Sequence, residues 1–113
     1  MGMSDYYYEE AVKYRYEYWE REGWLKSCLE ILERNYLDPH SDECTWDIID
    51  TVAMVVGLMD GSDGAEIALA RRISREDDYN SMLYYDYVRK VIQKRLDYTR
   101  EEIEEAEKVI EDY

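Results

Sequence analysis

The sequence is poor in helix-breaking residues and in the residue types that most often build reactive sites. Its 113 residues include one proline, five glycines, one histidine and two cysteines. Paired histidine ligands, a glycine-rich phosphate loop and an activated serine or cysteine are all missing. We therefore expect no enzymatic activity and no cofactor.

Basic residues are also scarce, and none occurs from Asn35 to Ala70. The chain has 28 acidic and 14 basic residues, a formal net charge of -14. Such a charge repels nucleic acid and anionic membranes and favours basic surfaces, including the grooves of nucleic-acid-binding proteins. Acidity that serves only solubility is the alternative interpretation.

Phenylalanine is absent, whereas tyrosine occurs 13 times and tryptophan three times. Tyrosine combines apolar area with a polar tip, which suits the rim of a core or a binding surface. We expect some of these rings to face a partner. Alternatively, a thin helical bundle consists mostly of core edges, where tyrosine replaces phenylalanine.

No apolar run approaches the 18 residues or so that suggest a membrane span, and we find no secretory signal. These features predict a cytoplasmic protein without membrane contact. Cys28 and Cys44 both fall on apolar helix faces and are expected to be reduced core residues. Residues 1–4 are expected to be disordered or left from cloning.

The segment from Ser41 to Asp60 carries the strongest helical pattern. Its apolar residues recur at three- and four-residue steps, which places them on one face of a helix that must be buried. They are Cys44, Ile48, Ile49, Val52, Val55, Val56 and Met59. All charged residues of the segment are acidic, so no internal base is expected to neutralise it. Turn residues from Gly61 to Gly64 should end this central helix.

Two long helices are predicted on either side of the central one. The first spans Asp5 to about Tyr36, because apolar stripes before and after Gly23 are in phase; two helices with a turn at Gly23 are the alternative. The other opens at the acidic cluster 76–78 and continues to the last residue. At 1.5 Å per residue it would measure about 52 Å, longer than a compact domain needs, so it should project or pair.

A short helix is expected from Asp63 to about Ser74, with Leu69, Ala70 and Ile73 facing inward. No segment has the alternating pattern of a strand. The predicted fold is all-α: one domain over residues 1–113, a bundle with two long helices, a buried central helix and a short connector helix.

Two segments superficially suggest metal sites. The run 60–66 begins like a calcium loop, but Ala65 stands where the loop needs glycine and Arg71 where it needs glutamate. His40 lies near Asp42, Glu43 and Cys44, types that ligate zinc, yet a histidine in a loop beside a proline is usually a solvated surface residue. We expect no metal at either place.

In its general features the chain resembles small, acidic, mostly helical phage proteins that inhibit host defence enzymes. These include the Ocr family of anti-restriction DNA mimics and several acidic anti-CRISPR proteins. The resemblance rests on size, helicity, tyrosine content, the base-free span from Asn35 to Ala70 and the acidic tail from Glu101 to Asp112. No motif can be aligned, so no functional residue is carried over.

The resemblance implies a non-enzymatic inhibitor that occupies the nucleic-acid-binding groove of a Cas effector or a restriction enzyme, in the cytoplasm of the infected bacterium if the protein is phage-encoded. The residues proposed for phosphate mimicry are Asp42, Glu43, Asp47 and Asp50, followed by Glu101, Glu104, Glu105, Tyr84 and Tyr87 as a secondary contact set. The alternative is a helical adaptor or structural protein that forms a homodimer or binds a partner helix.

Overall fold

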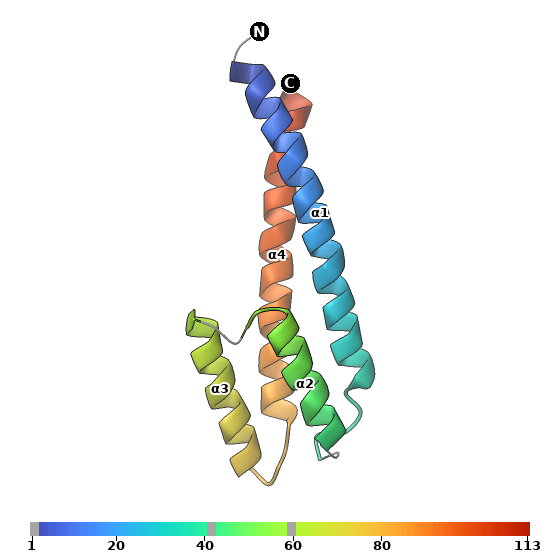
Figure 1. The fold of residues 1–113 in the computed structure, drawn as a ribbon, viewed down its shortest axis with the longest axis vertical. Coiled ribbons are helices and arrows are strands. Elements are labelled where there is room, and N and C mark those ends of the chain that lie inside the picture. Colours follow the sequence, from blue (N-terminus) through green and yellow to red (C-terminus); the bar gives the residue numbers. More distant parts are fainter. Residues whose placement is uncertain (1–2, 41–42, 59–60) are drawn as a thin grey trace. The chain divides into compact units, whose positions relative to one another are not determined.

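The computed structural model describes residues 3–40, 43–58 and 61–113, and it contains four helices within them (Figure 1). They are α1 (Met3–Asn35), α2 (Glu43–Val55), α3 (Gly61–Glu76) and α4 (Met82–Asp112). No strand occurs in the described ranges. The all-α class predicted from the sequence is therefore confirmed.

The chain packs into two compact units. Unit 1 consists of residues 1–26 and 94–113, and unit 2 of residues 27–93, so that α1 and α4 each contribute to both. Met3 and Ser4, which were expected to be disordered, belong to the backbone of α1. Met1 and Gly2 lie outside the described residues, and a single bundle over the whole chain stays a prediction.

Unit 1 is built from the first part of α1 and the last part of α4, which run antiparallel (Figure 1). The Tyr8 and Tyr113 rings stack with centroids 4.3 Å apart, and Arg100 pairs with Glu22 at 3.6 Å. The buried side chains of α4 in unit 1 have the three- and four-residue spacing of a helical face, and α1 contributes two more: Leu96, Thr99, Ile103 and Ala106 from α4, and Ala11 and Leu25 from α1.

The helix α1 continues through Gly23 without interruption, as the in-phase stripes predict. The backbone of Gly23 has no positive φ, and a Cβ added there would meet nothing within 4 Å. The alternative of two helices with a turn at this position is therefore wrong.

The helix α2 ends earlier than predicted, at Val55 rather than at the Gly61–Gly64 turn. Gly57 adopts a φ of 78°, and its amide donates to the carbonyl of Met54 at 3.0 Å. The amide of Leu58 donates to the carbonyl of Ala53 at 2.9 Å. This pair of bonds is the Schellman motif, in which a left-handed glycine satisfies the last carbonyls of a helix. The turn is strengthened because Leu58 and Ala53 are both fully buried.

Burial along α2 follows the predicted stripe only in part. Ile49, Val52 and Val56 are buried, but Val55 is half exposed. The side chains of Cys44 and Met59 lie outside the described residues. Three apolar side chains that were not predicted as core are also buried: Trp46, Ala53 and Leu58.

The inward face of α3 also differs from the prediction. Ala70 is buried as predicted, but Leu69 and Ile73 are more than 40 % exposed, and Ile67 and Ser74 are buried instead. The buried positions 67, 70 and 74 are three and four residues apart, so they share one helix face, and Leu69 and Ile73 lie beside that face. Asp63 lies in the first turn, where an acidic side chain interacts favourably with the helix dipole.

The acidic cluster 76–78 does not open α4, which begins at Met82. Asp78 and Tyr79 both have a φ of 56°, an uncommon conformation for residues other than glycine, and they form the turn between α3 and α4. The side chain of Asn80 then accepts a hydrogen bond from the amide of Met82 at 3.0 Å. The backbone and hydroxyl of Ser81 both donate to the carbonyl of Pro39, so this turn is tied to the loop that follows α1.

The two glycines provide a test of these backbone assignments. Gly23→Ala should raise the free energy of unfolding by about 0.4–1 kcal/mol, because alanine fits a helix and restricts the unfolded chain. Gly57→Ala should lower it by about 1–2 kcal/mol, because a Cβ is strained in the left-handed conformation. Urea unfolding of both variants measures the two effects. Two changes of the same sign would contradict one of the assignments.

Candidate functional site

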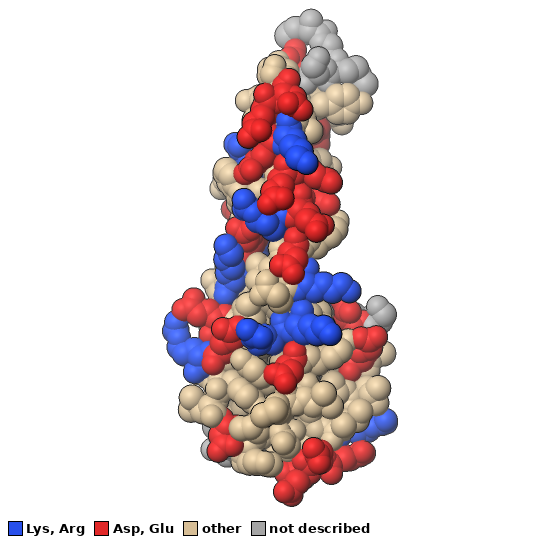
Figure 2. All heavy atoms as spheres, turned by 180° about the vertical axis from the view of Figure 1, so that it is seen from behind, with Lys and Arg blue, Asp and Glu red and all other residues tan. Residues whose placement is uncertain are grey.

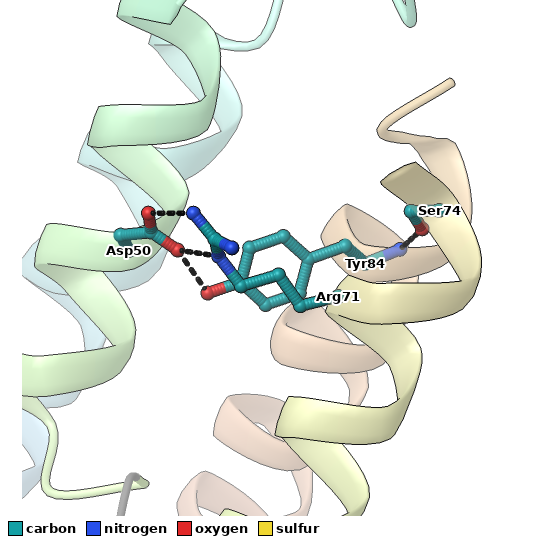
Figure 3. A network of polar contacts seen from close by, with 4 residues as sticks. All are labelled: Asp50, Arg71, Ser74 and Tyr84. Carbon is teal, nitrogen blue, oxygen red and sulfur yellow. Dashed lines mark hydrogen bonds and ion pairs between the residues drawn. The ribbon is translucent and has the colours of Figure 1, made fainter. Parts of the chain in front are cut away.

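Unit 2 is organised around a polar cluster that joins three helices (Figure 3). Asp50 of α2 accepts two hydrogen bonds of 2.8 Å from the guanidinium of Arg71 in α3. The hydroxyl of Tyr84 in α4 donates to the same carboxylate at 2.6 Å. The amide of Tyr84 donates to the hydroxyl of Ser74 at 2.9 Å. The side-chain hydrogen bonds of this cluster therefore link α2 to α3 and to α4, and α3 to α4.

Aromatic rings shield this cluster from water. Tyr84 is fully buried, and the Trp46 ring lies beside it with a centroid separation of 5.9 Å. The guanidinium carbon of Arg71 lies 5.8 Å from the centroid of Trp46 and 5.9 Å from that of Tyr84. A cation near ring faces gains a further electrostatic attraction. Partial burial and two parallel bonds make this ion pair stronger than a surface pair.

The protonation equilibria reflect the same contacts. Burial acts to raise the pKa of Asp50, but the hydrogen bonds from Arg71 and Tyr84 and the nearby positive charge outweigh it, so the pKa of this carboxyl is lowered. Burial and the bond to Asp50 raise the pKa of the Tyr84 hydroxyl. At neutral pH the cluster therefore contains a carboxylate, a guanidinium and an un-ionised phenol.

These contacts correct two expectations from the sequence. Asp50 was expected to lack a neutralising base, but Arg71, the first base after the base-free span, pairs with it. Tyr84 was predicted to contact a partner, but its side chain is fully buried. Both side chains hold the fold together. Asp50 is unsuited to phosphate mimicry because its carboxylate already has its partners.

The other predicted contact residues lie in different surroundings. Asp47 is exposed and borders a cavity of about 270 Å³ that is also lined by Trp46, Arg71, Arg75 and Tyr79. The side chains of Asp42 and Glu43 lie outside the described residues. Tyr87 is half buried, and its hydroxyl donates to Glu66. The three acidic residues Glu101, Glu104 and Glu105 are exposed on α4, in unit 1.

The segments considered for metal binding offer no assembled site within the described side chains. Among them, no group of three His, Cys, Asp or Glu residues lies close enough to hold an ion. His40 is exposed, and its amide donates to the side chain of Asp38 at 2.9 Å. Burial raises the pKa of the Cys28 thiol, which makes it less nucleophilic. None of the helices, over their described residues, is long and apolar enough to cross a membrane.

Charged groups are unevenly distributed on the face shown in Figure 2. Acidic side chains crowd the surface of unit 1, with basic side chains between them. Much of the unit 2 surface on this face is uncharged. The sequence had indicated acidity in both units, through the base-free span in unit 2 and the acidic tail from Glu101 to Asp112 in unit 1.

Unit 1 contains an open groove of about 680 Å³ between α1 and α4, which the sequence had not indicated. Its apolar surface comes from Ala11, Ala106 and Val109, and three tyrosines line it from α1: Tyr7, Tyr14 and Tyr18. The remaining lining residues are acidic: Glu10, Glu102 and Glu105. The stripe of small and aromatic residues early in α1 could have predicted this groove, because a pair of helices cannot fully bury such a stripe.

The Asp50 cluster leads to a stability prediction. Asp50→Asn should lower the free energy of unfolding by about 2–3 kcal/mol, because Arg71 and Tyr84 would lose a partly buried charged acceptor. The matched change Asp47→Asn, on the same helix but exposed, should alter it by less than about 0.5 kcal/mol. Denaturant unfolding measures both. Equal effects would mean that the cluster does not stabilise unit 2.

The pH dependence of this difference is a separate prediction. Because the folded pKa of Asp50 is lowered, its contribution is fully present above the unfolded value of about 3.9 and is lost as the pH falls through the folded value. The stability gap between the native protein and Asp50→Asn should therefore be largest at neutral pH and shrink in acid. Unfolding at pH 7 and at about pH 2 tests this, and a constant gap would contradict it.

No protein-family model, curated protein or solved structure matches this chain.

Proposed function

We propose that the protein is a non-enzymatic inhibitor that binds the nucleic-acid-binding groove of a basic protein, with a bacterial defence nuclease such as a Cas effector or a restriction enzyme as the target. The observation that carries the proposal is the acidic surface of α4 from Glu101 to Asp112. In this model of action, the acids occupy the places that phosphates normally take and so exclude nucleic acid. The target is recognised by its Lys and Arg side chains.

The charge density of this segment supports the proposal. Twelve residues from Glu101 to Asp112 include seven acids and one base, Lys108, a net charge of -6. At 1.5 Å per residue the segment measures about 18 Å, so it carries one net charge per about 3 Å. A single DNA strand carries one per about 3.4 Å of helix axis. The two densities are close enough for a basic groove to accept either.

The availability of the carboxylates is the second support. Glu101, Glu104, Glu105, Glu111 and Asp112 are all exposed. Within the described residues, the ion pair that involves this set joins Arg100 to Glu104 at 3.6 Å, and surface pairs of this kind are weak. The charges can therefore be redirected to a basic partner at little cost. Asp50, by contrast, would have to give up Arg71.

Exposed aromatic rings accompany these acids in unit 1. Tyr6, Tyr16 and Tyr98 are each more than half exposed, and Trp19 and Trp24 are nearly so. Aromatic side chains are enriched at protein interfaces, where they contribute contact area at low entropic cost. Acids that attract a basic surface and rings that pack against it suit a protein partner rather than a small substrate.

The alternative is a helical adaptor that pairs with itself or with a helix of a partner. The groove of unit 1 favours this second candidate, because an uncovered apolar face between two helices is where a further helix packs. In that case the acidity would set solubility and partner choice but would not imitate phosphate.

A competition assay tests the inhibitor proposal. Fluorescent duplex DNA bound to a panel of Cas effectors and restriction enzymes would be titrated with the protein. We expect displacement from at least one of them, weakening steeply as salt rises, because the contacts are ionic. Reversing the exposed tail acids in the triple variant Glu101→Lys, Glu104→Lys and Glu111→Lys should reduce displacement by more than tenfold.

A matched triple variant distinguishes the effect of charge at the α4 tail from the effect of the total charge of the protein. Glu76→Lys, Asp77→Lys and Asp86→Lys makes the same change in net charge at exposed positions of unit 2. Displacement should be largely retained in this variant. Equal losses from both triples would show that net charge alone governs binding. Absence of displacement from every nuclease in the panel would refute the proposal.

A further inference from the structure

The groove of unit 1 has the form of an incomplete helical bundle. In unit 1 the described residues come from two helices, and a pair of helices buries only the seam between them. Ala11 and Ala106 are almost fully buried at this seam, yet Val109 is 44 % exposed, Tyr14 49 % and Tyr7 55 %. The apolar stripe thus extends beyond the seam into the open groove, where no described residue covers it.

The groove has the dimensions of a short helix. Its lining on α1 extends from Tyr7 to Tyr18, a distance of about 17 Å along the axis, or three turns. Small side chains on its floor, Ala11 and Ala106, permit close approach of another backbone. Tyrosines on one side provide rings against which branched or long apolar side chains pack. A ligand with an apolar stripe repeated every three to four residues would fill it.

The charge of the groove decides which helix it would accept. Glu10 lies on the α1 side, and Glu102 and Glu105 lie on the α4 side. Across the described residues, no Lys or Arg forms an ion pair with any of these three carboxylates. A ligand helix that places its apolar stripe in the groove would have its flanking residues next to the carboxylates of α1 and α4. Basic flanks would be attracted, and acidic flanks would be repelled.

We propose that this groove is the docking site for an amphipathic helix of a partner protein, in which an apolar stripe of about three turns is flanked by Lys or Arg residues. A second copy of this chain is a poorer occupant, because each groove has acidic residues on both sides and each chain carries a net charge of -14. This inference goes beyond the proposed function: the groove shares Glu102 and Glu105 with the acidic segment of α4, but its apolar floor binds a helix whether or not the partner binds nucleic acid.

The test uses the full chain and a designed peptide as the probe. The peptide is an 18-residue amphipathic helix with a leucine stripe and lysines on both flanks, and its counterpart carries glutamates at the lysine positions. Fluorescence anisotropy should show saturable binding of the basic peptide that is at least tenfold tighter than binding of the acidic one. Higher salt should reduce this preference.

Variants locate the peptide on the protein. Val109→Arg places a bulky cation in the groove at a position that is already exposed, and it should weaken the basic peptide by about tenfold or more. Ile31→Arg, at a comparably exposed apolar position of α1 in unit 2, should have no effect. The double variant Glu10→Lys and Glu105→Lys should reverse the preference in favour of the acidic peptide. Circular dichroism confirms that each variant is folded.

Three results would overturn the inference. The first is no saturable binding of the basic peptide, and the second is equal affinity for the native protein and Val109→Arg. The third is a homodimer in sedimentation that Val109→Arg dissociates, which would make a second copy the occupant. Failure of DNA displacement in the nuclease assay would leave peptide binding unaffected, because the tail triple Glu101, Glu104 and Glu111 does not line the groove.

Discussion

The bidentate pair between Asp50 and Arg71 is the constraint on which unit 2 depends. A carboxylate held 2.8 Å from a guanidinium fixes α2 against α3, and the Tyr84 hydroxyl brings α4 to the same point. Because the three groups are largely withdrawn from water, removing one leaves the others without a partner at a higher cost than a surface pair would incur. The turn after α3 contains two residues in the left-handed conformation, and it leads into the first turn of α4, which contains Tyr84.

The acidic residues differ in whether their charge is already paired within the fold, as it is for Asp50, or remains exposed to solvent. The chain has twice as many acidic as basic residues, so at least half of the carboxylates have no base to neutralise them. Arg71 is committed to the core of unit 2, and Arg89 pairs with Glu33 at 2.9 Å. The exposed acids of the α4 tail keep their charge available for a partner. The proposed inhibitor function rests on these side chains, and the proposed docking groove on the apolar surface beside them.

Unit 1 and unit 2 differ in how completely they bury their large side chains. Unit 2 has segments of four helices and fully encloses side chains such as Tyr84, Leu32 and Ile49. Unit 1 has two helices, so its tyrosines remain half exposed along the groove. The absence of phenylalanine fits this arrangement, because a ring that stays partly in water benefits from a hydroxyl. An amphipathic partner helix would give these rings the cover that the chain itself does not provide.

The sequence by itself determined the all-α class, the continuity of α1 through Gly23 and the presence of a long final helix, because helical periodicity depends only on residues a few positions apart. It also contained the signal for the end of α2, since a glycine between Val56 and Leu58 is typical of a Schellman turn. Only the tertiary structure decided that Asp50 is a core residue and that Tyr84 is buried beside it. The physical reason is that a carboxylate's role depends on which cation lies within 3 Å or so, and Arg71 is distant in sequence and brought there by packing.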